Sequence, residues 1–379
     1  MKPTILGMQT SPMGQPGSVS GPLSAHLHQA IAQAGGWLPF DRYMALALYA
    51  PEGGYYAHGS RKFGQLPGSG SDFVTAPELS PLFGRALAVQ VAELLAASGT
   101  DEVMEFGAGS GALAEQLISA LDAAGTPLAR YTIIDLSGAL QARQAERLAR
   151  FGARVQWRQA WPDTLQGVVV GNEVLDAMPV QLLHFDGQQW LERGVATQGE
   201  GFVFADRPTP LRPPLAAPFV PGTVTEIHPQ AEAWVRSLAE RLQRGAALLI
   251  DYGFPEAEYY LPQRHGGTLM CHQAHRADPD PLSQVGDKDI TAHVNFTGIA
   301  LAAQDAGLGV LGYTSQARFL LNCGLPDLMN AASLAERVMA LKLVNEHEMG
   351  ELFKVIALGA PGLALQPLGF AAGDRTHRL

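Results

Sequence analysis

The chain has 379 residues, of which 47% are hydrophobic, which is enough for one large domain with added segments or for two domains. Its net charge of −10 argues against a nucleic-acid-binding protein, since such proteins gain affinity from lysine and arginine on phosphates. No run approaches the roughly 18 consecutive apolar residues that a transmembrane helix needs, so we expect no membrane insertion.

The N-terminal segment carries no targeting pattern. Residues 1–22 are rich in Gly, Pro, Ser and Gln, which predicts a disordered lead-in rather than a signal or transit peptide. Residues 23–98 are predicted to be a mostly helical cap segment, with amphipathic patterns at 23–34 and 78–97 and a loop between them. Because Cys271 and Cys323 suggest no disulfide framework, we expect a reducing, cytoplasmic setting.

From residue 99 onward, short apolar strands alternate with helices. We predict strands at 103–106, 131–134, 154–157 and 168–170, with helices at 112–123 and before residue 150. Such alternation is typical of a parallel sheet with helices on both faces, so the fold class is α/β. The core is expected to span 99–358, and the last residues, 359–379, read as a loose tail.

Two stretches interrupt this alternation. The first, about 186–245, contains the second strand of a hairpin that turns at Asp186-Gly187, a proline-rich run and a helix at 229–243. The sheet resumes at 246–250 and is interrupted again at about 252–292, before a helix near 296–306 and strands at 310–314 and 353–358. We expect both insertions and the segment 23–98 to form a cap over the carboxyl edge of one sheet.

A glycine-rich turn follows the first strand of the core. The segment 105–111 reads EFGAGSG, which places Gly107, Gly109 and Gly111 between a strand end and a helix start. Glycine lets a ligand approach the backbone, and a helix N-terminus offers free N–H groups. Asp135 ends the next strand, where a carboxylate can accept hydrogen bonds from both ribose hydroxyls. We predict that Glu105, these glycines and Asp135 bind an adenosyl cofactor.

The same turn also fits a dinucleotide fingerprint, with Gly107, Gly109 and Ala112 in the G-x-G-x-x-A positions. An NAD(P)-dependent oxidoreductase is therefore the alternative. The acidic Glu105 before the turn and the long preceding segment count against a dinucleotide, as does the polar end of the fourth strand. We therefore favour S-adenosyl-L-methionine.

The fourth strand ends in polar residues, since 168–179 reads VVVGNEVLDAMP. In open parallel sheets, ligands bind at the carboxyl ends of the strands. We therefore predict that Asn172 contacts the cofactor and that Glu173 and Asp176 are catalytic carboxylates. The alternative makes Asp176 a helix cap and Glu173 a solvated loop residue.

Several blocks together resemble the MidA-like family of methyltransferases, whose mitochondrial member is a complex I assembly factor and arginine methyltransferase. They cover nearly the whole chain from about 35 to 325, and the blocks at 72–78 and 289–296 are the most specific. The blocks are 43–49, 53–56 (GGYY), 70–78 (GSDFVTAPE), 105–111, 172–179 (NEVLDAMP), 251–253 (DYG) and 289–296 (DITAHVNF).

The resemblance implies a seven-stranded, Rossmann-like class I methyltransferase core with S-adenosyl-L-methionine as its cofactor. It also implies an arginine acceptor in a protein substrate, such as a subunit of respiratory complex I. We expect the block 72–78 to lie against the cofactor, with Phe73 and Thr75 nearest. Since a guanidinium is always charged, Glu173 and Asp176 would orient it and receive a proton. A non-catalytic assembly chaperone that retains the fold is a further alternative.

No metal site is expected. The segment 271–275 (CHQAH) crowds soft ligands together but lacks the second pair that a structural zinc needs. Glu226, His228 and His293 are reserve candidates for catalysis. For Glu226 and His228 the favoured interpretation is that they belong to the start of the helix after the proline-rich run. For His293 the alternative is a buried histidine bonded to the backbone.

Overall fold

The computed structural model describes residues 21–57, 75–135, 137–273 and 276–379. Its centre is a sheet with seven strands in the order β15-β16-β10-β5-β2-β3-β4, and the short β14 (Val294–Asn295) pairs with the end of β10. Neighbouring strands on this path are parallel except for the two pairs that β16 makes. The seven strands are β2 (Glu102–Phe106), β3 (Arg130–Ile134), β4 (Val155–Arg158), β5 (Leu165–Asn172), β10 (Leu242–Phe254), β15 (Gly309–Ser315) and β16 (Phe353–Gly359). This confirms the expected α/β fold with a seven-stranded core.

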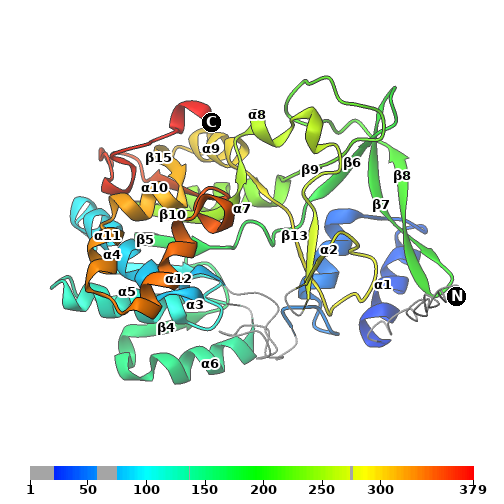
Figure 1. The fold of residues 1–379 in the computed structure, drawn as a ribbon. Coiled ribbons are helices and arrows are strands. Elements are labelled where there is room, and N and C mark those ends of the chain that lie inside the picture. Colours follow the sequence, from blue (N-terminus) through cyan, green and yellow to red (C-terminus); the bar gives the residue numbers. More distant parts are fainter. Residues whose placement is uncertain (1–20, 58–74, 136, 274–275) are drawn as a thin grey trace, which may run out of the picture.

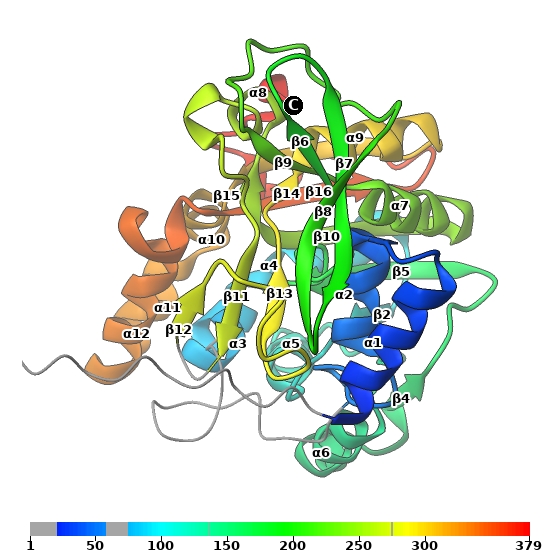
Figure 2. The ribbon, with the colours of Figure 1, turned by 90° about the vertical axis from the view of Figure 1, so that its right-hand side faces the viewer.

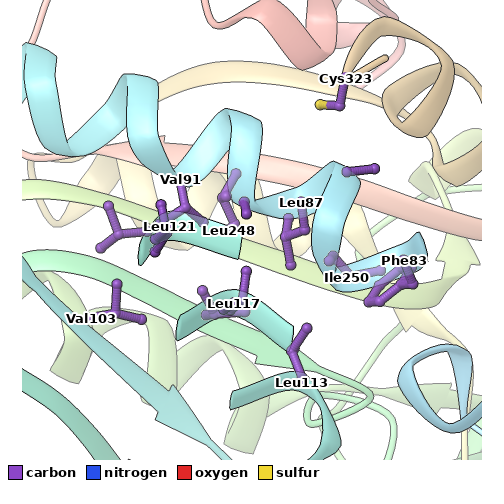
Figure 3. Close-up of a cluster of buried hydrophobic side chains, with 14 of the residues drawn as sticks. Phe83, Leu87, Val91, Val103, Leu113, Leu117, Leu121, Leu248, Ile250 and Cys323 are labelled. Carbon is purple, nitrogen blue, oxygen red and sulfur yellow. The ribbon is translucent and has the colours of Figure 1, made fainter. Parts of the chain in front are cut away.

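Helices cover both faces of this sheet, because alternate strand residues point to opposite sides. Leu248 and Ile250 of β10 pack with α4 (Pro81–Ser98) and α5 (Ala112–Ala123), as Figure 3 shows. Ala247 and Leu249 pack with α7 (Pro229–Arg241) and α9 (Phe296–Asp305) on the other side. The first face is completed by α10 (Gln316–Asn322), α11 (Leu325–Ala331) and α12 (Leu334–Val344). The strand at 246–250 is recognisable from sequence because burial on both faces makes it continuously apolar.

A second body lies beside the core (Figures 1 and 2) and is built from the N-terminal helices and the inserted strands. Helices α1 (Gly21–Gln33) and α2 (Phe40–Tyr49) pack against an antiparallel sheet in a cluster that includes Leu27, Tyr43, Leu182 and Val195. That sheet has the order β1-β7-β6-β9, with β8 also paired to β7, and a separate small sheet has the order β12-β11-β13. Their strands are β1 (Leu38–Pro39), β6 (Gln181–Phe185), β7 (Trp190–Gln198), β8 (Gly201–Pro208), β9 (Val224–Ile227), β11 (Met270–Gln273), β12 (Arg276–Asp278) and β13 (Asp289–Thr291).

Two predicted helices differ in the structure, one in its bounds and one in the part of the fold to which it belongs. The single helix expected at 78–97 is divided into α3 (Ala76–Leu79) and α4, because Ser80 caps α4 by accepting a hydrogen bond from the N–H of Leu82 at 3.3 Å. The helix expected at 229–243 is α7, which packs on the core sheet through Val235. That helix therefore belongs to the core rather than to the cap insertion at 186–245.

The C-terminal residues 359–379 do not form the loose tail expected from the sequence. Phe370 is 5% exposed and its ring lies 5.4 Å from that of Phe319 on α10. The hydroxyl of Thr314 donates a hydrogen bond to the carbonyl of Gly373 at 2.7 Å. The residues that make these contacts, Phe370 and Gly373, follow no helical or strand period. The hydrophobic pattern of the sequence therefore does not predict that this segment packs on the core.

Most of the expected lead-in, residues 1–20, lies outside the described residues. Within the described part of the chain, no helix has both the length and the apolar character required to cross a bilayer. The same residues contain no cluster of three or more His, Cys, Asp or Glu side chains that could hold a metal ion.

Candidate cofactor and acceptor site

The glycine turn connects β2 to α5 at the carboxyl edge of the sheet. Gly107, Gly109 and Gly111 have φ values of 64°, 53° and 81°, in the left-handed region where side chains are disfavoured. A Cβ atom at Gly107 would also approach the side chain of Val174 to 3.3 Å. The turn therefore needs glycine at these positions to bring its backbone to the ligand side of the sheet. Gly111 differs from the other two because it is the N-cap residue of α5.

Asp135 follows β3 and is 8% exposed. Its carboxylate accepts hydrogen bonds from the N–H of Ser137 at 2.9 Å and from Nε2 of Gln144 at 2.8 Å. Gln144, on α6 (Gly138–Leu148), also donates to the carbonyl of Gly109 at 2.9 Å. The acidic residue and the glycine turn are thus joined through one side chain.

A cavity of about 170 Å³ lies between the core and the second body. Eight of the ten predicted site residues line it: Thr75, Glu105, Gly107, Gly109, Asp135, Asn172, Glu173 and Asp176. Gly111 is not a lining residue, and Phe73 lies outside the described residues. Tyr49, Tyr56, Glu78 and Asp289 also line the cavity. The structure therefore brings residues from seven separate stretches of the sequence to one place.

Glu105 is almost fully buried at the base of this cavity. Burial raises the pKa of its carboxyl to about 7, against the lowering effect of the hydrogen bond that the hydroxyl of Tyr131 donates at 2.7 Å. A cationic ligand in this cavity would favour the ionised form of Glu105, because an opposite charge lowers the pKa of a carboxyl.

The loop after β5 is held by Asp251, which lies in β10. One oxygen of Asp251 accepts hydrogen bonds from the N–H groups of Val174, Leu175 and Asp176 at 3.2, 2.9 and 3.2 Å. Within this loop Glu173 has a φ of 55°, a left-handed conformation that is costly for a residue with a side chain. The Asp251 carboxylate therefore maintains a strained loop at the edge of the cavity.

Three carboxyl groups meet in this region, of which Asp176 and Asp251 are buried and Glu173 is half-buried. Burial, together with the neighbouring charge of Asp176, raises the pKa of Glu173 to about 8. Burial also raises the pKa values of Asp176 and Asp251, and for Asp251 the charges of Asp176 and Glu173 add to the effect. Within the described residues, no ion pair joins any of the three to a lysine or arginine. The oxygen Oδ1 of Asp176 is also buried without a hydrogen-bond partner there. This is an arrangement that a cation would complete.

A second cavity, of about 320 Å³, lies on the other side of these carboxyl groups. It shares Glu173, Asp176 and Asp289 with the first cavity. Its other walls come from β10, β11, β13, the residues between them, and the segment around β16. They are Tyr252, Thr268, Met270, His272, Thr291, His293, Met349, Leu352 and Phe353. The acidic residues thus form the boundary between a cavity lined by the glycine turn and one with mostly uncharged walls.

The reserve candidates occupy different positions. His293 lines the second cavity, and burial lowers its pKa to about 4, so its imidazole is neutral. Glu226 accepts hydrogen bonds from the hydroxyl of Tyr259 at 2.8 Å and from the N–H of Thr268 at 2.8 Å. His228 pairs with the carbonyl of His293 at 2.9 Å. Glu226 and His228 line neither cavity. They support the wall of the second cavity from behind, because they are hydrogen-bonded to Thr268 and His293, which line it.

Several residues of the site were not assigned a role from the sequence, among them Tyr49, Tyr56, Asp251 and Asp289. Tyr49 and Tyr56 stack with ring centroids 5.4 Å apart, and the hydroxyl of Tyr56 donates to Asp289 at 2.9 Å. All four lie in blocks that carry the family resemblance, which was the available signal. The blocks themselves do not tell which member of each faces a ligand.

The sheet order, the antiparallel β16 and the glycine turn followed by Asp135 define a class I S-adenosylmethionine-dependent methyltransferase fold. Residues 86–314 match the family described as "Putative S-adenosyl-L-methionine-dependent methyltransferase", and the chain belongs to this family.

Solved structures agree with this assignment. The chain is 52% identical to a COG1565 superfamily member from Burkholderia thailandensis bound to S-adenosyl-homocysteine, with a TM-score of 0.92 over 95% of this chain and 97% of that one. A native crystal structure of a COG1565 superfamily protein from the same organism gives 50% identity and a TM-score of 0.87, over 95% of this chain and 97% of that one. The cofactor is therefore S-adenosyl-L-methionine rather than a nicotinamide dinucleotide.

Two more distant relatives have names that specify the methyl acceptor. The chain is 27% identical to "Protein arginine methyltransferase NDUFAF7, mitochondrial" of Danio rerio, over 90% of this chain and 87% of the relative. Identity to the Homo sapiens protein of the same name is 26%, over 89% and 83% of the two chains.

Proposed function

We propose that this protein transfers a methyl group from S-adenosyl-L-methionine to an arginine side chain of a protein substrate. The observation that carries the proposal is the group of buried and half-buried carboxyls between two cavities, without a positive partner in the described structure. A guanidinium would complete this group, because it is permanently charged and carries five N–H donors in a planar fork. The names of the relatives in Danio rerio and Homo sapiens support an arginine acceptor.

The cavity of about 170 Å³ is proposed as the cofactor site. Asp135 would accept hydrogen bonds from the ribose hydroxyls, and the backbone of Gly107 and Gly109 would contact the amino-acid part of the cofactor. Asn172 fits a contact with the cofactor because its Oδ1 atom is buried and unpartnered among the described residues. Thr75 and Glu105 would complete the wall, and Phe73 remains a prediction.

S-adenosyl-L-methionine, when bound, supplies a methyl group on a positively charged sulfur. The residues of this chain would bind the acceptor in the cavity of about 320 Å³ and direct its guanidinium toward the first cavity. Asp176 would pair with the guanidinium through its unpartnered oxygen. Glu173, whose pKa of about 8 lies near physiological pH, is suited to receive the proton that the guanidinium loses on methylation.

The complete assignment can be tested with an extract from cells that lack the protein. The purified protein and labelled S-adenosyl-L-methionine are added, and methylated peptides are identified by mass spectrometry. We expect methylarginine, with a subunit of respiratory complex I as the leading candidate substrate. Glu173→Gln and Asp176→Asn should bind S-adenosyl-homocysteine normally but reduce methylation by ~100-fold or more, since they remove interactions made in the transition state.

Asp186→Asn, at the exposed hairpin turn, is the matched control and should methylate at the normal rate. Methylation of another residue type would refute the arginine assignment. Cofactor binding without any methylated product would favour a non-catalytic assembly role. Normal rates in both carboxyl variants would show that the acceptor is held by other residues.

A further inference from the structure

We propose that Gln144 is a positioning residue for the cofactor, which orients the Asp135 carboxylate and ties it to the glycine turn. Gln144 lies on α6 and is fully buried, and it does not line the cavity. It therefore acts on the cofactor only through other residues. The inference rests on the proposed contact between Asp135 and the ribose.

Both polar ends of the Gln144 side chain are engaged. Its Nε2 atom donates to the carbonyl of Gly109 at 2.9 Å and to Oδ2 of Asp135 at 2.8 Å. Its Oε1 atom accepts a hydrogen bond from Nε1 of Trp157 at 2.9 Å. An amide nitrogen has two hydrogens, so the two donations use the full capacity of this group.

The Trp157 contact decides the orientation of the amide. An indole N–H can only donate, so it must face the amide oxygen and leave the amide nitrogen toward Asp135. With the amide reversed, its oxygen would face the carbonyl of Gly109 and the carboxylate of Asp135, which are both acceptors. Trp157, on β4, therefore fixes Gln144, and Gln144 in turn fixes Asp135.

This arrangement has a functional consequence. Since Oδ2 of Asp135 is held by Gln144 and Oδ1 by the N–H of Ser137, the plane of the carboxylate is set before a ligand arrives. A carboxylate that is already oriented loses less conformational freedom when it accepts the two ribose hydroxyls. Gln144 should therefore affect ligands that have ribose hydroxyls and leave ligands without them nearly unaffected.

The test measures the binding of two probes by calorimetry: S-adenosyl-homocysteine and its 2′,3′-dideoxy analogue. We expect Gln144→Leu to weaken the binding of S-adenosyl-homocysteine by about tenfold, and Trp157→Phe by a few-fold, with little change for the dideoxy analogue. Asp135→Ala should also weaken S-adenosyl-homocysteine binding selectively. The double variant Asp135→Ala/Gln144→Leu should bind no more weakly than Asp135→Ala alone.

The matched control is Gln141→Leu. Gln141 lies one turn earlier on α6 and donates to the backbone carbonyl of Asp135 at 2.9 Å, not to its carboxylate. It should bind both probes normally. If Gln144→Leu does not fold, Trp157→Phe alone decides the question, because it removes only the donor that orients the amide.

Four outcomes would overturn the inference. Equal losses for both probes would show that Gln144 only maintains the local structure, and additive losses in the double variant would show that it acts independently of Asp135. If Asp135→Ala itself binds S-adenosyl-homocysteine normally, then the proposed ribose contact fails as well. If Asp135→Ala weakens binding and both Gln144→Leu and Trp157→Phe do not, the ribose contact stands and the positioning role is refuted.

Discussion

Asp251 should be one of the most sensitive positions in this protein, although it lies behind the carboxyls that we assign to catalysis. Replacing it with alanine removes the oxygen that accepts hydrogen bonds from three consecutive N–H groups, those of Val174, Leu175 and Asp176. Asp251 is 1% exposed, so water cannot easily replace that oxygen. The left-handed conformation of Glu173 would then lose the contacts that maintain it.

The magnitude follows from the geometry. One of the three hydrogen bonds is short, at 2.9 Å, and two are longer, at 3.2 Å. An unsatisfied buried N–H costs about 1–3 kcal/mol. Removing the Asp251 carboxyl also removes its repulsion with Asp176 and Glu173, which offsets part of the cost of the three lost hydrogen bonds. We therefore expect Asp251→Ala to lower the free energy of unfolding by about 3 kcal/mol. Asp251→Asn, which keeps an acceptor oxygen, should lose clearly less.

Urea unfolding followed by circular dichroism measures the stability, and methyl transfer at saturating cofactor measures the catalytic effect. Asp186→Ala is the control, since Asp186 also accepts two backbone N–H groups, at 2.7 and 2.8 Å, but at an exposed turn where water can substitute. It should change stability only slightly. If Asp251→Ala is as stable as the wild-type protein and transfers methyl groups normally, Asp251 does not organise the loop.

Two further predictions concern stability. The raised pKa of Glu173, from 4.5 to about 8, and that of Asp176, also raised, mean that the folded protein binds more protons than the unfolded chain between those values. Stability without ligands should therefore be greatest in mild acid and fall as the pH rises toward 8, and Glu173→Gln should flatten this dependence in urea titrations at several pH values. Phe370→Ala should lower the free energy of unfolding by about 3–5 kcal/mol, because this side chain is buried against Phe319. A loss below about 1 kcal/mol would show that the C-terminal segment contributes little to the core.

Much of the core could be predicted because its signals are local. The helix expected at 112–123 has the same bounds as α5, since a glycine turn marks its start and apolar residues recur with the helical period. Asp135 was proposed for the same reason, because an acidic residue at the end of an apolar strand is a local pattern, and it lines the first cavity. Helices α2 and α10 to α12 were not predicted. Helices α10 and α11 have only 7 residues each, and the apolar residues of α12 do not gather on one face. Helix α2 does have an amphipathic pattern, which was overlooked.

The sequence by itself therefore determined the seven strands of the core, the glycine turn with the helix that follows it, and the polar residues at the strand ends. Only the tertiary structure decided which residues meet across the site. Asp251 is 76 residues from Leu175, and Tyr56 is 233 residues from Asp289, yet both pairs are hydrogen-bonded. Such pairs form because parallel strands bring their carboxyl ends to one edge and inserted segments pack over it. Periodicity along the chain reports which face of an element is buried, but it does not report which distant residue that face will contact.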